Sequence, residues 1–346
     1  MPILLAAAAG AASVAAAQSP AKAPAAASCT STPVRPAVAA APLRLFAYDR
    51  SQALDVRDSV EGVQRGVTVK RVSFASPKGG RATGMLLVPH DSLRGAGGRF
   101  AGVVSMHGAP GDARGMMGLA LPLASRGAVV LVLDAPWARR DPRNPLTFTA
   151  RDSADQVQLV VDLQRAVDVL AARADVDADR LGYFGVSYGG AMGALFAGVE
   201  RRLKAYALLV GDGGLAAHFT RADGRRMDPP GPVPPAQWCG WFQAMEPLAS
   251  TRFVGRATGA RLLFLWGTRD ELVPPYLAEQ LWQAAPAGVK EARWYDSGHR
   301  LPEAAHLDMA DWLASRIGTR AVSAAERAAF PAATPVRRQG ATAGTG

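Results

Sequence analysis

LGYFGVSYGGAMGALFAGV, residues 181–199, is the most informative segment of this chain. Its first part, 181–186, is an apolar run that predicts a buried strand, and the small residues 188–199 predict a helix that follows at once. Ser187 stands at the turn between them, with a glycine two positions before it and another two positions after it. A sharp strand-to-helix turn lifts the middle side chain clear of the sheet, and glycines are needed where the two elements approach closely. Ser187 is therefore a candidate nucleophile, and the alternative is an ordinary turn serine.

Apolar runs and amphipathic segments alternate along the rest of the chain. The predicted strands are 67–74, 83–88, 101–106, 128–133, 181–186, 205–210, 261–266 and 290–295, and the predicted helices are 156–170, 188–199, 276–284 and 302–317. Continuous apolar strands alternating with helices are typical of an α/β fold with a mostly parallel, doubly wound sheet. No helix separates the first two strands, so we expect them to form an antiparallel hairpin at one edge.

The composition divides the chain into four parts. Residues 1–17 hold an Ala- and Leu-rich run that ends in small residues and predicts a signal peptide, so we expect an exported protein, periplasmic or secreted. The alternative is an Ala-rich leader without that role, because no basic residue precedes the run. The run is too short and too weakly apolar to predict stable membrane insertion. A disordered linker is expected over 18–43, a folded domain over 44–318, with a lid at about 211–260 after the sixth strand, and a disordered tail over 319–346.

The chain is basic, with a formal net charge of +10. Lysine supplies only five of the 39 basic residues, and no run of five basic residues occurs. Abundant Ala, Gly, Pro and Arg together favour a solvated arginine-rich surface over a functional basic face. No nucleic-acid-binding signature is present, so nucleic acid is not an expected partner.

A serine hydroxyl needs a base to take its proton, and that base needs a carboxylate to orient it. His299 lies in a loop directly after a predicted strand and is the expected base. Asp270 follows the preceding strand on the same sheet edge and is the expected orienting acid, and the rivals are Glu271 and Asp296. Of the other histidines, His218 lies in the lid, where a structural role is favoured over contact with substrate.

A tetrahedral oxyanion needs two preorganised N–H donors. Tyr188, the residue after the candidate nucleophile, is expected to supply one. The Gly-rich turn 107–111 follows another apolar strand, and the N–H of Ala109 is the expected second donor, because Pro110 has none to give. His107 would tie this turn down. The alternative for the segment is an ordinary glycine-rich turn.

These motifs, 107–111, 185–190, 267–270 and 297–299, occur in the order of the α/β-hydrolase superfamily. Over about residues 66–318 the chain resembles dienelactone hydrolase-like and prolyl-oligopeptidase-like serine esterases. The resemblance implies hydrolysis of an acyl ester or an amide, with no metal ion and no organic cofactor. The first hypothesis is hydrolysis of a small-molecule or polymer ester through an acyl-enzyme. Two departures matter: no β-propeller region precedes the domain, and the nucleophile is Ser where dienelactone hydrolases have Cys. A serine peptidase or amidase is the second hypothesis, and a non-catalytic binding protein is the third.

Three features stay open at the level of sequence. The sequence does not indicate whether Cys29 and Cys239 form a disulfide bond. No CxxC motif or His/Cys cluster predicts a zinc site. The aromatic residues of the segment 238–245 suit either an apolar pocket or the core of a lid. The arginines of 139–143 suit either a substrate carboxylate or the protein surface, and the surface is favoured. The oligomeric state is not indicated.

Overall fold

A computed structural model of the chain describes residues 42–330. Within this range the strands are β1 (Arg57–Gln64), β2 (Val67–Ala75), β3 (Arg81–Pro89), β4 (Phe100–Met106), β5 (Ala128–Leu133), β6 (Val176–Val186), β7 (Ala205–Leu209), β8 (Arg261–Gly267) and β9 (Lys290–Tyr295). They form one sheet in the order β1-β2-β3-β5-β4-β6-β7-β8-β9. The six strands from β5 to β9 in this order run parallel, and β1, β2 and β3 are antiparallel to their neighbours. The sheet is thus mostly parallel, as the alternation of strands and helices predicts.

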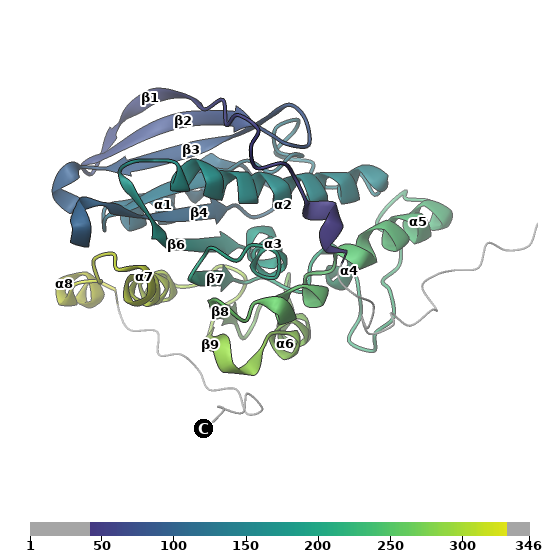
Figure 1. Cartoon of the computed structure of the whole chain (residues 1–346). Coiled ribbons are helices and arrows are strands. Elements are labelled where there is room, and N and C mark those ends of the chain that lie inside the picture. The colour runs from purple at the N-terminus through teal and green to yellow at the C-terminus, as the bar shows by residue number, and fades with distance from the viewer. Residues whose placement is uncertain (1–41, 331–346) are drawn as a thin grey trace, which may run out of the picture.

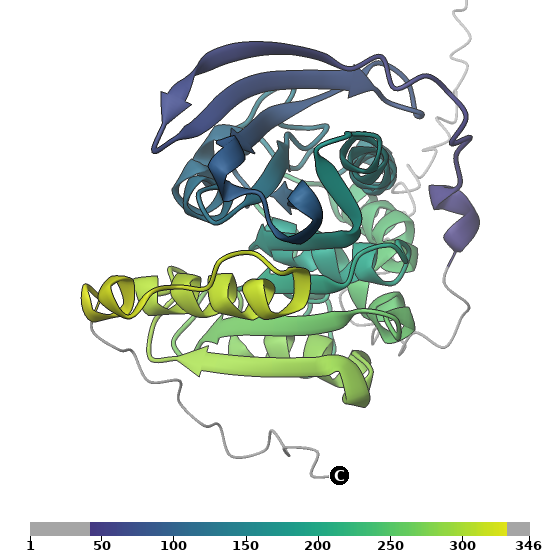
Figure 2. The same ribbon diagram turned by 60° about the vertical axis from the view of Figure 1, so that its left-hand side comes forward.

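Helices cover both faces of the parallel part of the sheet (Figure 1). The α-helices are α1 (Met117–Ala124), α2 (Ala150–Ala171), α3 (Tyr188–Ala197), α4 (Leu215–His218), α5 (Pro235–Met245), α6 (Pro275–Ala284), α7 (Glu303–Ile317) and α8 (Ala324–Ala328). Two large apolar clusters separate the layers, one under α2, α3 and α6 and the other under α1 and α7. Figure 2 shows α7 on the opposite face from α3 and α6, so the central parallel strands β4, β5 and β7 are buried on both sides.

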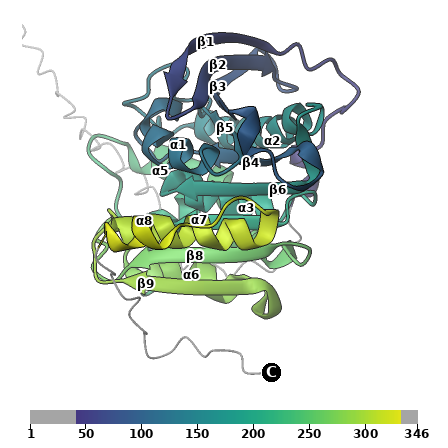
Figure 3. The ribbon, with the colours of Figure 1, turned by 90° about the vertical axis from the view of Figure 1, so that its left-hand side faces the viewer.

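β1 lies at the edge of the sheet and is an addition to the eight strands that the sequence predicts (Figure 3). Nearly all its residues are exposed, including Val60 and Val63. A strand with no buried face carries no hydrophobic alternation, so pattern analysis has no signal to detect there. Pairing with β2 is what holds it extended. The expected hairpin at this edge is the β2–β3 pair.

Residues 319–330, which the sequence assigns to a disordered tail, contain helix α8 in the structure. A capping box between Ser323 and Glu326 begins this helix, and the Glu326 carboxylate accepts a 2.6 Å hydrogen bond from Arg126 near the end of α1. These polar contacts, which composition does not reveal, extend the folded part beyond 318. The predicted signal peptide, Cys29, nearly all of the predicted linker and residues 331–346 lie outside the described residues.

The segment between β7 and β8, predicted as a lid, contains α4, α5 and three short 3-10 turns. Trp238, Trp241, Phe242 and Met245 of α5 are buried and form a cluster with Ala216 of α4. These aromatic side chains therefore build a small core of their own. Cys239 on α5 is not a free thiol. None of the helices within residues 42–330 combines the length and apolar character needed to cross a membrane.

Candidate active site

Ser187 occupies the turn between β6 and α3 with a φ of 55° and a ψ of −116°. A non-glycine residue at positive φ is strained, and here two glycines make the turn possible. A Cβ on Gly185 would lie 2.3 Å from the Gly189 carbonyl oxygen, and one on Gly189 would lie 2.1 Å from that of Met106. The Ser187 N–H donates to Leu209 on the neighbouring strand at 2.8 Å. The backbone thus presents the Ser187 side chain at the carboxyl edge of the sheet.

His299 and Asp270 form a chain of hydrogen bonds with Ser187. The Nε2 atom of His299 lies 2.9 Å from Ser187 Oγ, and its Nδ1 atom lies 2.8 Å from Asp270 Oδ2. Asp270 is 3% exposed, and its other oxygen accepts hydrogen bonds from the N–H groups of Leu272 and Val273. An ionised carboxylate only accepts hydrogen bonds, so it holds the imidazole proton on Nδ1 and leaves Nε2 to accept from the serine.

Two adjoining loops bring Asp270 and His299 together. The Thr268 N–H donates to Tyr295, and the Arg269 N–H donates to Ser297 at 2.9 Å. A Cβ on Gly267 would lie 2.3 Å from the Gly298 carbonyl oxygen, so only glycine permits this approach. Of the two rival acids, Glu271 is exposed, and Asp296 pairs with Arg269 at 3.2 Å.

Ala109 and Tyr188 lie beside Ser187. Both line the cavity that contains Ser187 and His299. Gly108, which precedes Ala109, packs against the serine, since a Cβ on Gly108 would lie 3.3 Å from Ser187 Cβ. Neither the Ala109 nor the Tyr188 N–H takes part in the backbone hydrogen bonds of the described residues. Two free N–H groups near the serine are the arrangement that an oxyanion site requires.

His107 holds the turn that carries Ala109. Its Nδ1 lies 2.6 Å from the Gly108 carbonyl oxygen, and its Nε2 accepts a hydrogen bond from the Ala135 N–H at 3.1 Å. Burial lowers the pKa of His107, and this outweighs the opposing effects of the Gly108 carbonyl and the nearby Asp134 and Asp112. A neutral imidazole with both nitrogens bonded connects this turn to the loop after β5.

The cavity at the serine has a volume of about 200 Å³. Its wall consists of Ala109, Pro145, Leu146, Ser187, Tyr188, Ala191, Asp212, Leu215, His218, Phe219, Leu272, Val273 and His299. Most of these side chains are apolar. Such a cavity suits a small substrate with few polar anchoring points.

His218 and Asp212 form a second histidine–aspartate pair in this wall. The Nδ1 atom of His218 lies 2.7 Å from Asp212 Oδ2. Burial lowers the pKa of His218, but the hydrogen bond to Asp212 and the charges of Asp212 and Asp270 outweigh it and raise the pKa above its ordinary value. Sequence reasoning favours a structural role for His218 and leaves Asp212 unremarked. The position of Asp212 in the sequence could have identified it as a candidate site residue, because it follows a strand at the same sheet edge as Asp270.

The arginines near the end of β5 are engaged within the protein. Arg139 lies 2.8 Å from the buried carboxylate of Asp162, and Arg140 pairs with Asp155. Arg143 pairs with Asp141 at 3.4 Å. None of the three lines the cavity at Ser187. These contacts account for the arginines without a substrate carboxylate.

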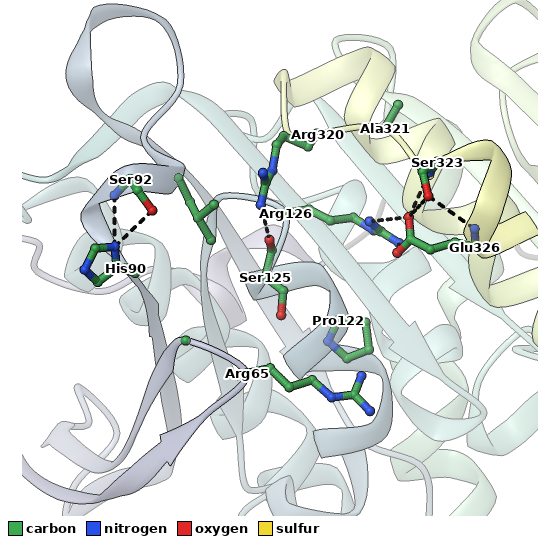
Figure 4. A pocket seen from close by; sticks show the side chains of 12 residues that line it. Arg65, His90, Ser92, Pro122, Ser125, Arg126, Arg320, Ala321, Ser323 and Glu326 are labelled. Atoms are coloured by element: carbon green, nitrogen blue, oxygen red, sulfur yellow. Dashed lines mark hydrogen bonds and ion pairs between the residues drawn. The ribbon is translucent and has the colours of Figure 1, made fainter.

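A larger hollow, of about 790 Å³, lies at the opposite edge of the sheet. It is bordered by Arg126, which lies just before β5 begins, and so sits beyond the amino ends of the parallel strands. Figure 4 shows Arg126 reaching Glu326 and Arg320 reaching Ser125, while His90 bonds Ser92. Its serines and histidine form no chain with a carboxylate like that at Ser187. The smaller cavity is therefore the candidate active site.

Comparison with known proteins finds one family and a set of solved structures that this chain resembles. The prolyl oligopeptidase family matches residues 150–316. The structure is similar to an acetyl xylan esterase from Paenibacillus sp. R4 (TM-score 0.62, 20% identity, 79% of this chain and 91% of that one). It is also similar to acetyl xylan esterase 1 from Thermoanaerobacterium sp. JW/SL YS485 (TM-score 0.58, 16% identity, 78% of this chain and 90% of that one). A third similar structure is a cold-adapted esterase from an Arctic intertidal metagenomic library (TM-score 0.55, 18% identity, 77% of this chain and 100% of that one). No curated protein sequence matches the chain.

Proposed function

We propose that this chain is a serine hydrolase of the α/β-hydrolase superfamily that cleaves carboxylic esters through an acyl-enzyme, a proposal that the prolyl oligopeptidase match and the similar fold of the acetyl xylan esterase support. The observation that carries the proposal is the chain of hydrogen bonds from Ser187 through His299 to Asp270, with distances of 2.9 and 2.8 Å. Serine, imidazole and carboxylate in this order are the arrangement that activates a hydroxyl for attack on a carbonyl.

In the proposed reaction Ser187 Oγ attacks the ester carbonyl while His299 Nε2 takes the hydroxyl proton. His299 then gives that proton to the departing alcohol, which leaves the acyl group on Ser187. A water molecule enters, loses its proton to His299 and attacks the acyl-enzyme, which releases the acid and restores the serine. Asp270 keeps the imidazole in the tautomer that both halves of the reaction need.

The N–H groups of Ala109 and Tyr188 stabilise the negative charge that develops on the carbonyl oxygen, by donating hydrogen bonds to it. Tyr188 begins α3, so its N–H has no partner within the helix and points with the positive end of the helix dipole. Removing one such donor from an enzyme of this type lowers kcat by about 10²–10³.

A peptidase or amidase is the second candidate, and the match to the prolyl oligopeptidase family favours it. The esterases among the similar structures favour ester cleavage, which we rank first. A p-nitrophenyl ester and the p-nitroanilide with the same acyl group separate the two activities. Amide cleavage as fast as ester cleavage would reverse the ranking.

Ser187→Ala tests the proposed function directly. We expect kcat on p-nitrophenyl acetate to fall by about four to six orders of magnitude, because the nucleophile is removed. A fluorophosphonate probe should label the wild-type protein on Ser187 and leave the variant unlabelled. Unlabelled wild-type protein would instead favour the binding-protein hypothesis. Ser105→Ala, at a buried serine of β4, is the matched control.

Two further parts of the proposal concern the surroundings of the site. We infer that the segment 211–260 acts as a lid, because Leu215, His218 and Phe219 from it line the cavity beside Ser187. We also propose export, on the strength of the sequence of residues 1–17. Mass spectrometry of the mature protein from a native-like host, with its N-terminus intact or cleaved, decides that point.

A further inference from the structure

The second histidine–aspartate pair is built in the same way as the first. Asp212 is 4% exposed, and its Oδ1 accepts a 2.9 Å hydrogen bond from the Gly214 N–H. Its Oδ2 lies 2.7 Å from His218 Nδ1. Because the carboxylate only accepts, the imidazole proton is on Nδ1. The ring of Phe219 packs edge-on against the imidazole, with 5.2 Å between the ring centres, which further restricts its orientation.

The other ring nitrogen of His218 is left for a ligand. The hydrogen bonds of the described residues include His218 Nδ1 but none to Nε2. The imidazole borders the cavity that also contains Ser187 and His299. Apart from Ser187, His299 and the Asp212 that holds it, the side chains of this wall are apolar or, as in Tyr188, packed against Trp137. His218 Nε2 is thus the polar group that a bound substrate meets beyond the reacting atoms.

A hydroxyl group is the partner that suits this nitrogen best. A neutral imidazole with its proton on Nδ1 accepts a hydrogen bond at Nε2, whereas an imidazolium donates one. A hydroxyl both donates and accepts, so it bonds His218 in either state. A carboxylate or a carbonyl bonds only the imidazolium. The hydrogen bond to Asp212 and the charges of Asp212 and Asp270 raise the pKa of His218 against the effect of burial, and a hydroxyl serves the imidazole whether or not it is protonated.

We propose that His218, held by Asp212, is a specificity-determining residue that hydrogen-bonds a hydroxyl group of the ester substrate. This rests on the proposed esterase function and narrows its substrate class to hydroxylated esters. The hydroxyl is either on the alcohol, as in partial esters of polyols, or on the acyl group, as in esters of hydroxy acids. A pocket built to bond a hydroxyl rejects the analogue that lacks it, because the polar group is then left unpaired.

The test compares kcat/KM within two isosteric pairs of esters. 2-Hydroxyethyl acetate against propyl acetate places the hydroxyl on the alcohol, and ethyl glycolate against ethyl propionate places it on the acyl group. The hydroxyl-to-methyl ratio of each pair is measured for the wild type, His218→Phe and His218→Gln. Dividing the wild-type ratio by the ratio of the variant cancels the intrinsic reactivity of the esters. His306→Phe is the matched control, because His306 lies on α7, outside the cavity.

We expect His218→Phe to lower the ratio of one pair by about tenfold, since one substrate hydrogen bond is lost. His218→Gln, whose amide reaches toward the position of Nε2, should restore part of it, and His306→Phe should leave both ratios unchanged. The pair that responds identifies which side of the ester carries the hydroxyl. Ratios that stay the same in both His218 variants would overturn the proposal.

Labelling by a fluorophosphonate keeps the two proposals apart. Variants that label like the wild type have an intact Ser187 site, so an unaltered ratio in them counts against the role of His218 alone. If the probe does not label His218→Phe, the hydroxyl-to-methyl ratio of His218→Gln is used to test the role of His218 instead. A wild-type protein that neither labels nor hydrolyses any of the four esters overturns the esterase function, and the role of His218 with it.

Discussion

The pairs Asp270–His299 and Asp212–His218 share one arrangement, and their aspartates follow neighbouring strands. Each aspartate stands three residues beyond the end of its strand, β8 for Asp270 and β7 for Asp212. Each keeps one carboxylate oxygen on a backbone N–H two residues ahead, at 2.9 Å, and the other on an imidazole Nδ1. The pairs differ at Nε2, where His299 meets Ser187 and His218 meets the cavity.

We propose that this single difference separates the catalytic role of His299 from the substrate-binding role of His218. A base must lie within hydrogen-bond reach of the proton that it removes, and only His299 satisfies this condition with the serine. Chemical composition alone does not distinguish the pairs. What distinguishes them is where the strained turn at Ser187 places one hydroxyl.

Replacing each aspartate by asparagine should produce the largest difference between the two pairs. Asp270→Asn should lower kcat on p-nitrophenyl acetate by about 10⁴, because the amide favours the wrong tautomer of His299. Asp212→Asn should lower it by no more than about tenfold, because His218 takes no part in proton transfer with Ser187. Steady-state kinetics measure both effects. Losses of equal size would mean that the second pair takes part in the chemistry.

The glycines around the two sites offer a second contrast, in stability. A Cβ on Gly189 would lie 2.1 Å from a backbone oxygen, whereas one on Gly213, beside Asp212, would meet only methyl groups, the nearer at 2.8 Å. We expect Gly189→Ala to lower the free energy of unfolding by about 3 kcal/mol and Gly213→Ala by about 1 kcal/mol. Urea unfolding of the two variants measures both values. A larger loss for Gly213→Ala would contradict the ranking.

The smallest expected effect is a pH dependence at the second pair. The pKa of His218 is raised in the folded protein, because Asp212 and Asp270 outweigh the opposing effect of burial. A group of this kind stabilises the fold fully below its unfolded pKa of about 6.5, and the contribution is lost as the pH rises through the folded pKa. Asp212→Asn should lower the pKa of His218, which NMR titration of the imidazole protons reports.

The same variant should therefore show a difference in Tm from the wild type that is largest near pH 6 and narrows toward pH 9. His306→Gln, at a partly exposed imidazole on α7 paired with Glu303, is the control. A difference in Tm that widens as the pH rises would show that the sign of the pKa shift is wrong.

Much of the fold was predictable because its strands are buried on both faces. β5 is continuously apolar, as is β8 after its first residue, Arg261, and a parallel sheet covered by helices requires this of its strands. β1 was not predicted because it lies at an open edge of the sheet and has no run of apolar residues. Helix α8 escaped it because a capping box and ion pairs, rather than apolar periodicity, hold it in place.

The candidate site was predictable to the extent that local sequence encodes it. The glycines around Ser187 are required by contacts within a few residues and with the adjacent strand, so the motif reports the turn. The Asp212–His218 pair is equally local, six residues apart, yet no motif marks it. Its meaning depends on the cavity, which is formed by segments as distant as Pro145 and Val273.

The alternation of strands and helices, the turn at Ser187 and the order of the residues that gather there can be read from the amino-acid sequence, because each of these depends on short-range sterics and burial. The three-dimensional fold is needed to show that His299 reaches the serine while His218 faces the cavity, and that the aromatic residues of α5 pack into a core. Those outcomes depend on the distances between loops from different strands, which long-range packing sets and which no local pattern records.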